Sequence, residues 1–173
     1  FLAKLNESAP QFSRGRAVMP LNFTVRDKEV KPAVLICYED VVRDLAVEGV
    51  KNGANLLVNI TNDAWFGHSS APYQHNQLAS FRAIETRRYL LRDTNTGYTA
   101  VINPLGEVES DLKPFTSNVL QAKVVLLNYL TIYVLYGQTA LKVVIISYWV
   151  LLLLLFFKRK KVGRRKIFNF KKG

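Results

Sequence analysis

Apolar and polar positions in the first half of the chain form a strand pattern followed by a helix pattern. Residues 33–36 are a continuous run of apolar, mostly branched side chains, which is typical of a strand buried on both faces. The run ends at Cys37, and apolar side chains then recur at helical spacing over residues 42–50, with Glu39 and Asp40 in the expected first turn. The pattern predicts a strand that leads into a helix, with Cys37 between them.

The same alternation follows a second time. Residues 55–60 read as another buried strand, residues 62–67 as a loop, and residues 73–89 as a helix in which apolar positions recur near helical spacing. Strands that alternate with helices predict parallel βαβ packing, and therefore an α/β fold class.

The remaining residues before the last apolar stretch predict shorter elements. Residues 1–30 are interrupted by proline and glycine and indicate a loop-rich entry with a short strand near 21–25. Later segments predict strands at 90–93 and 98–102, a turn at 103–106, an antiparallel continuation at 107–109 and one more strand at 119–127.

A long apolar stretch near the end of the chain predicts a transmembrane helix. Residues 139–157 would extend roughly 28 Å as a helix, close to the hydrocarbon thickness of a bilayer. They are apolar on every face and carry one charge, Lys142, near the amino-terminal edge. The alternative is a core helix of a globular domain, but such a helix usually carries its apolar side chains in a stripe on one side.

The net charge of +11 is concentrated in a basic tail, residues 158–173, which holds nine Lys or Arg and no acid. The chain before the tail is therefore close to neutral, which argues against a nucleic-acid partner and for a membrane with anionic lipid. The positive-inside rule places the tail in the cytoplasm and residues 1–138 on the opposite side.

Cys37 is the single cysteine, so an internal disulfide framework is excluded. At the start of a helix its thiol would face unpaired backbone N–H groups, which favour a thiolate and can stabilise an oxyanion during acyl transfer. The alternative is that Cys37 is merely the last apolar side chain of its strand. His68 and His75 lie seven residues apart without a third ligand cluster, so we assign no metal site.

Several segments resemble a known family. Residues 34–39, Val-Leu-Ile-Cys-Tyr-Glu, resemble the nucleophile motif of the nitrilase (carbon-nitrogen hydrolase) superfamily. Further segments are similar to its apolipoprotein N-acyltransferase branch: 59–67, 72–75, 82–85, 91–97, 100–102 and 104–107. The resemblance extends over roughly residues 10–157.

The resemblance implies a bacterial inner-membrane enzyme. Residues 1–138 would be the carboxy-terminal part of a periplasmic nitrilase-like α/β/β/α sandwich, 139–157 the transmembrane helix and 158–173 a cytoplasmic tail. An acyl chain would pass from a phospholipid donor to Cys37 as a thioester, and then to the amino group of a diacylglyceryl apolipoprotein acceptor. No cofactor is implied.

The resemblance also suggests roles for residues near Cys37. Tyr38 and Glu39 would support the nucleophile, although packing and helix-start roles remain open for both. Asn62, Trp65 and Phe66 would form a substrate loop, with turn formation and loop anchoring as the alternatives.

The chain departs from the family upstream of Cys37. The family's triad adds a glutamate base and a lysine before the cysteine, but the surroundings of Glu7 and Lys4 match neither motif. We therefore expect a carboxy-terminal fragment that is inactive alone. Two other hypotheses remain: a nitrilase-type amidase, which would need no membrane anchor, and a non-catalytic membrane remnant.

Overall fold

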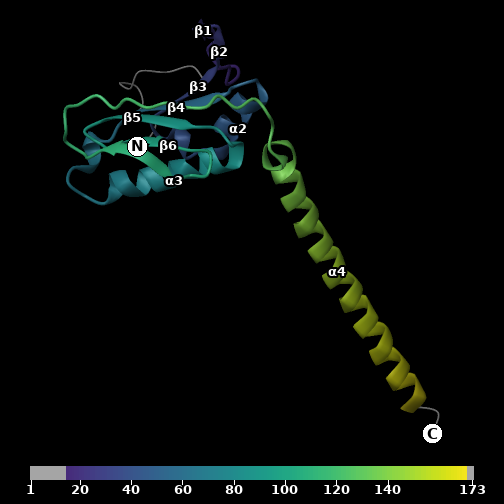
Figure 1. The fold of residues 1–173 in the computed structure, drawn as a ribbon. Coiled ribbons are helices and arrows are strands. Elements are labelled where there is room, and N and C mark those ends of the chain that lie inside the picture. Colours follow the sequence, from purple (N-terminus) through teal and green to yellow (C-terminus); the bar gives the residue numbers. More distant parts are fainter. Residues whose placement is uncertain (1–14, 171–173) are drawn as a thin grey trace, which may run out of the picture. The chain divides into compact units, whose positions relative to one another are not determined.

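The computed structural model describes residues 15–170, which divide into two compact units at the boundary between Thr131 and Ile132. The first unit contains a two-stranded and a five-stranded sheet (Figure 1). Its elements are β1 (Phe23–Val25), β2 (Lys28–Val30), β3 (Pro32–Ile36), η1 (Cys37–Asp40), α2 (Arg43–Lys51), β4 (Leu56–Asn62), η2 (Ala64–Phe66), α3 (Ala71–Thr86), β5 (Leu90–Asn95), β6 (Thr99–Ile102) and β7 (Val108–Leu112).

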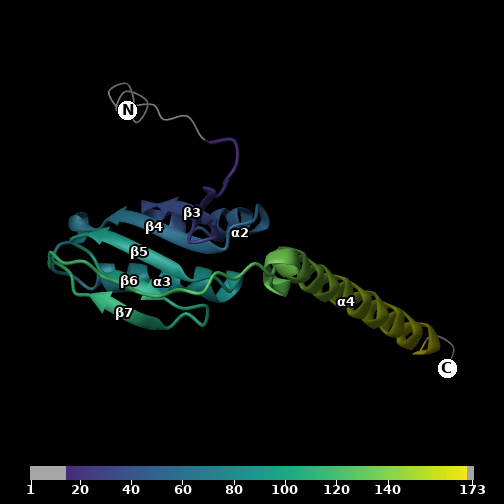
Figure 2. The same cartoon turned by 45° about the horizontal axis from the view of Figure 1, so that its top comes forward.

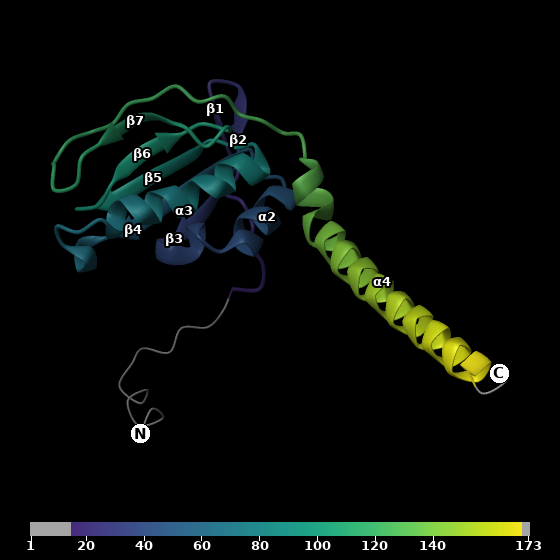
Figure 3. The same ribbon diagram turned by 90° about the horizontal axis from the view of Figure 1, so that it is seen from below.

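The larger sheet has the order β3-β4-β5-β6-β7, visible in Figure 2. Strands β3, β4 and β5 are parallel, whereas β6 and β7 are antiparallel to their neighbours. Helices α2 and α3 cover one face of this sheet, as Figure 3 shows. The predictions of βαβ packing and of an antiparallel continuation after residue 106 are therefore confirmed.

The core lies between the sheet and these two helices. Leu35, Leu57 and Leu90 on the three parallel strands are fully buried. Helix α2 approaches the sheet closely at Gly49, where an added Cβ would lie 2.7 Å from the Cβ of Ala33. A side chain at this position would push the helix away from β3, because real Cβ atoms do not come so close.

Helix α3 is shorter than predicted and buries a different face. It spans Ala71–Thr86 rather than 73–89, and it ends where Arg87 adopts a left-handed conformation with φ of 52°. The apolar positions that suggested the helix, Leu78, Phe81 and Ile84, are substantially exposed. Small and polar side chains face inward instead: Pro72, His75, Asn76, Ala79, Arg82, Ala83 and Thr86.

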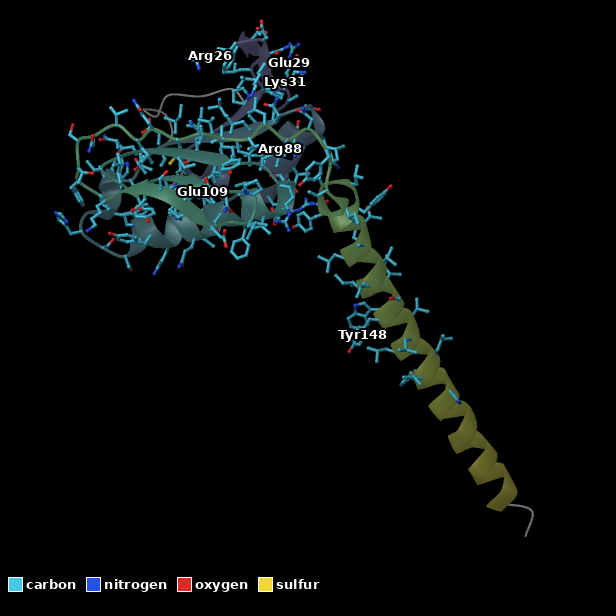
Figure 4. All side chains as sticks on the ribbon, viewed as in Figure 1. Arg26, Glu29, Lys31, Arg88, Glu109 and Tyr148 are labelled. Carbon is cyan, nitrogen blue, oxygen red and sulfur yellow. The ribbon has the colours of Figure 1, made fainter. Side chains whose placement is uncertain are left out.

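The amino-terminal hairpin consists of β1, which was expected near residues 21–25, and β2, which the sequence pattern did not predict. Strand β1 pairs with β2 through a tight turn in which Arg26 and Asp27 have φ of 48° and 62°. Such turns usually carry glycine or asparagine, so this one gave no clear signal. Figure 4 shows Arg26, Glu29 and Lys31 around this hairpin, and Lys31 Nζ lies 2.9 Å from Glu29 Oε2.

The predicted strand at 119–127 is wrong. The segment is extended along the chain but joins neither sheet. Val119 and Leu120 line a cavity of about 570 Å³ together with Val58, Leu91 and Val101 of the sheet. The segment therefore runs beside the sheet without adding a ladder of backbone hydrogen bonds, and Val119 and Val125 stay largely exposed.

The second unit is helix α4 (Ile132–Phe170). It begins seven residues before the predicted start, and its Ile132–Phe156 segment contains an 18-residue window with a mean hydropathy of 2.3 and no buried residue, whereas Val134 near its start is buried. This segment is long and apolar enough to cross a membrane; Tyr148 projects from it in Figure 4. The predicted assignment of residues 1–138, 139–157 and 158–173 to periplasm, membrane and cytoplasm stays a prediction. Lys4 and Glu7 lie outside the described residues.

Candidate active site

Cys37 lies at the carboxyl end of β3, where the parallel strands β4 and β5 also end. Its side chain is exposed. Its backbone is left-handed, with φ of 52°, a conformation that strains a residue with a Cβ by about 1–3 kcal/mol. Such a conformation persists only where neighbouring groups hold it, so the turn at Cys37 is imposed by its surroundings.

The turn itself differs from the predicted helix start. Cys37, Tyr38, Glu39 and Asp40 form the short 3-10 helix η1, and α2 begins only at Arg43. The macrodipole of a helix acts within its first turn. The prediction that Cys37 occupies the amino end of a regular α-helix is therefore wrong, and other groups must shape its environment.

Hydrogen bonds from three elements hold the turn. The backbone N–H of Ile36 donates to Glu39 Oε2 at 2.8 Å. Asn59 on β4 donates its Nδ2 to the carbonyls of Leu35 at 3.1 Å and Cys37 at 2.9 Å. From α3, Arg82 Nη1 donates to the carbonyl of Val41 at 2.6 Å, just beyond η1. Glu39 thus stabilises the turn through the backbone of Ile36, and its predicted role in supporting a nucleophile stays a prediction.

A buried cluster of four charged or titratable side chains lies directly behind this turn. Asp40 comes from η1, Asp63 from the end of β4, His75 from α3 and Arg92 from β5. Each is at most 4% exposed. Arg92 Nε lies 3.3 Å from Asp40 Oδ2, and Arg92 Nη2 lies 3.1 Å from Asp63 Oδ2.

His75 completes this cluster through both ring nitrogens. Nε2 lies 2.8 Å from Asp40 Oδ1, and Nδ1 lies 3.1 Å from Asp63 Oδ1 and 2.7 Å from Arg92 Nη2. The ring therefore meets protein partners on both sides. Among residues 15–170, no group of three or more His, Cys, Asp or Glu side chains is arranged to hold a metal ion.

Gly97 fits against this cluster. A Cβ added at this buried glycine would lie 2.6 Å from both Cβ and Oδ2 of Asp63. The turn after β5 thus closes one side of the Asp63 carboxylate, and any larger residue there would displace it.

Two of the predicted site residues meet above His75. The ring centroid of Tyr38 is 5.4 Å from that of His75, and the ring of Phe66 approaches it edge-on at 6.4 Å. Both aromatic side chains are partly exposed. The predicted loop and the predicted nucleophile motif are therefore brought together.

The other two loop residues have different surroundings. Trp65 is 87% exposed, which leaves a large apolar side chain in contact with solvent. Asn62 Oδ1 accepts a hydrogen bond from the N–H of Ala64 at 3.1 Å, so its side chain stabilises the loop's first turn. This contact agrees with the alternative that Asn62 is a turn former.

Sequence reasoning gave no site role to Asn59, Asp40, Asp63, His75 or Arg92. A signal was nevertheless present, because Asn59 and Arg92 interrupt apolar runs that were predicted to be buried strands. A polar side chain in a buried strand needs partners, and here those partners surround the turn at Cys37.

Comparison with known proteins bears on what this site does. Residues 5–129 match the carbon-nitrogen hydrolase family. The chain belongs to the carbon-nitrogen hydrolase family. The match includes Cys37, its turn and the whole buried cluster behind it.

Within this family, the chain is similar in sequence to proteins of the apolipoprotein N-acyltransferase branch. The chain is 40% identical over 124 residues to the apolipoprotein N-acyltransferase of Geobacter metallireducens, covering 72% of this chain and 23% of that protein. It is 36% identical over 153 residues to the enzyme of the same name from Photobacterium profundum, covering 88% and 29%. The resemblance to this branch is confirmed, and the chain spans about a quarter of the length of these relatives.

A solved structure supports the fold. The carbon-nitrogen hydrolase of Helicobacter pylori G27 superposes with a TM-score of 0.51 at 15% identity, over 60% of this chain and 42% of that protein. The predicted fold class, a partial nitrilase-like α/β domain followed by one apolar helix that could cross a membrane, is confirmed.

Proposed function

We propose that this chain carries the nucleophile of an apolipoprotein N-acyltransferase. The observation that carries the proposal is that Cys37 is exposed in a strained turn directly after the buried parallel strand β3. The chain is also similar to enzymes of that name. A thiol held out of its strand in this way is available for attack on an acyl carbonyl.

The transfer proceeds in two steps through Cys37. The thiolate attacks the ester carbonyl of a phospholipid, the carbon-sulfur bond forms, and the lysophospholipid leaves with a proton on its alkoxide oxygen. The α-amino group of a diacylglyceryl apolipoprotein then attacks the thioester, forms the amide and releases the thiol as the amine proton is removed. The family's triad also uses a glutamate base and a lysine upstream of the cysteine, and the residues before Cys37 match neither motif. That this chain is inactive alone stays a prediction.

The aromatic side chains near Cys37 suit an apolar acyl chain. Tyr38 in η1, and Trp65 and Phe66 in η2, are all more than a third exposed. Apolar surface of this kind gains free energy when a lipid chain covers it. We assign these side chains to the acyl chain, and Glu39 to support of the nucleophile.

The apolar helix α4 supports action at a bilayer. Both substrates are anchored in lipid, and a membrane-spanning Ile132–Phe156 segment would hold the catalytic unit at the same surface. In this proposal residues 1–138 lie in the periplasm, the basic tail lies in the cytoplasm and the membrane is the bacterial inner membrane.

The test is acylation of Cys37 in the full-length protein. Protein incubated with vesicles of a deuterium-labelled phosphatidylethanolamine is digested and analysed by mass spectrometry, with Cys37→Ala as the control. We expect a labelled, hydroxylamine-sensitive adduct on the peptide that contains Cys37. Absence of this adduct from wild type, or its presence in Cys37→Ala, would overturn the proposal.

A further inference from the structure

Asn59 lies fully buried in the middle of β4, directly beside Leu35 in the parallel register. Its Nδ2 donates to two carbonyls, those of Leu35 and Cys37, which flank Ile36. The amide orientation follows from these partners, because reversing it would set Oδ1 against two other oxygens. One side chain thus joins the end of the strand to the proposed nucleophile.

The acceptor end of the same amide is not satisfied. Within the described part of the chain, Asn59 Oδ1 is buried and has no hydrogen-bond partner. An unpaired acceptor in a core is destabilising, and an apolar side chain of similar size would avoid this penalty. The two hydrogen bonds from Nδ2 are therefore what the asparagine provides at this position.

These two hydrogen bonds span the point where the backbone changes conformation. Ile36 is extended, with φ of −99° and ψ of 127°, whereas Cys37 is left-handed, with φ of 52°. Without a donor at its carbonyl, Cys37 can relax toward negative φ, which would rotate its Cα–Cβ bond and move Sγ. The amide opposes this relaxation because it fixes the carbonyls before and after Ile36.

We propose that Asn59 is a positioning residue that holds the Cys37 backbone in its left-handed conformation and so aims the thiol at the acyl carbonyl. This inference rests on the proposed function, in that Cys37 must be the nucleophile. Asn59 touches neither substrate nor thiol in this role; it acts through the Cys37 carbonyl. A shift of about 1 Å in an attacking atom is enough to slow a reaction by about 100-fold.

Asn55, the residue immediately before β4, provides a matched control at the opposite end of this strand from Cys37. It is also buried, at 2% exposed, and also bonds two backbone groups, accepting from Lys31 N at 2.8 Å and donating to Glu29 O at 2.9 Å. Its contacts hold the strand near β2, far along the sheet from Cys37. Loss of either amide should destabilise the fold, but only loss of Asn59 should change the thiol.

The experiment compares Asn59→Leu with Asn55→Leu in the full-length protein. Two rates are measured: Cys37 acylation from labelled phospholipid vesicles, and alkylation of Cys37 by iodoacetamide as a function of pH. We expect Asn59→Leu to slow acylation by about 10- to 100-fold and to shift the alkylation profile, while Asn55→Leu leaves both close to wild type. Equal effects of the two variants on both rates would overturn the inference.

Two further arms keep the outcome decisive. If Asn59→Leu does not yield folded protein, Asn59→Ser replaces it, since its hydroxyl can donate to only one of the two carbonyls, and the same comparison with Asn55→Leu applies. Failure of wild type to form any acyl adduct would overturn the proposed function, whereas the alkylation profiles test Asn59 independently of that result.

Discussion

His75 Nε2 lies 2.8 Å from Oδ1 of Asp40, the last residue of the turn that begins at Cys37. Helix α3 is thereby connected to the proposed nucleophile through one hydrogen bond and three residues of backbone. His75 also lies beside Asp63 and Arg92, so its ring connects α3 to η1, to the end of β4 and to β5.

Replacing His75 should therefore loosen the turn as well as the core. In His75→Phe, the buried carboxylates of Asp40 and Asp63 lose a partner, and we expect the free energy of unfolding to fall by about 3 kcal/mol. Urea unfolding followed by far-ultraviolet circular dichroism measures this loss. His68→Phe is the control, because that exposed ring only stacks on Phe115. Equal midpoints for the two histidine variants would contradict the prediction.

Gly97→Ala should disturb the same cluster from the other side. Its new methyl group would overlap Asp63, so either the carboxylate or the turn after β5 must move. We expect a loss of about 1–3 kcal/mol in unfolding free energy and slower acylation of Cys37. Gly15→Ala serves as the matched change, since nothing lies within 4 Å of a Cβ at that position. A wild-type acylation rate in Gly97→Ala would show that Asp63 does not influence the nucleophile.

Within residues 15–170, the hydrogen bonds of the Arg88 guanidinium go to backbone carbonyls rather than to a carboxylate. The guanidinium of Arg88, labelled in Figure 4, donates to the carbonyls of Ala54 at 2.9 Å and Tyr129 at 2.8 Å, two residues far apart in sequence. Burial lowers the pKa of Arg88 from its ordinary value. Arg88→Leu leaves these carbonyls unpaired, and we expect about 3 kcal/mol of destabilisation by urea unfolding. Exposed Arg16→Leu should stay within about 0.5 kcal/mol of wild type.

Tyr98 should titrate at unusually high pH. Burial, with a further contribution from the hydrogen bond to Asp111, raises the pKa of its phenol to about 12. Because the folded pKa lies above the unfolded value of about 10, the stabilisation is fully present below pH 10 and is lost as pH rises toward 12. Ultraviolet titration of phenolate, with Tyr98→Phe used to assign the signal, should find this group ionising last. Ionisation of Tyr98 near pH 10 in the native protein would contradict the prediction.

The sequence was sufficient to locate the parallel strands and the position of Cys37, because buried strands in such sheets are short continuous apolar runs. It was insufficient for α3, where Leu78, Phe81 and Ile84 suggested the buried face and are instead exposed. The inward face of that helix carries His75 and Arg82, whose burial depends on partners from β4, β5 and η1 that no local pattern can reveal.

The site residues divide in the same way. Cys37, Tyr38 and Glu39 are contiguous and were found from their motif, and Phe66 was found from its loop. Asn59 and Arg92 come from neighbouring strands, and their side chains reach the turn only because the strands are parallel and in register. A contact of this kind is created by tertiary pairing, so it has no signature within either strand alone.

The alternation of side chains along β4 limits which insertions and deletions this strand can accept in evolution. Leu57, Asn59 and Thr61 share one buried side, whereas Ile60 and Asn62 are exposed. A single-residue deletion that shifted the register of this strand would move the amide of Asn59 to the opposite face and away from the Cys37 carbonyl. The register of β4 that places Leu57 in the core is therefore also the register that brings the Asn59 amide to Cys37. A mutation that shifts this strand changes both.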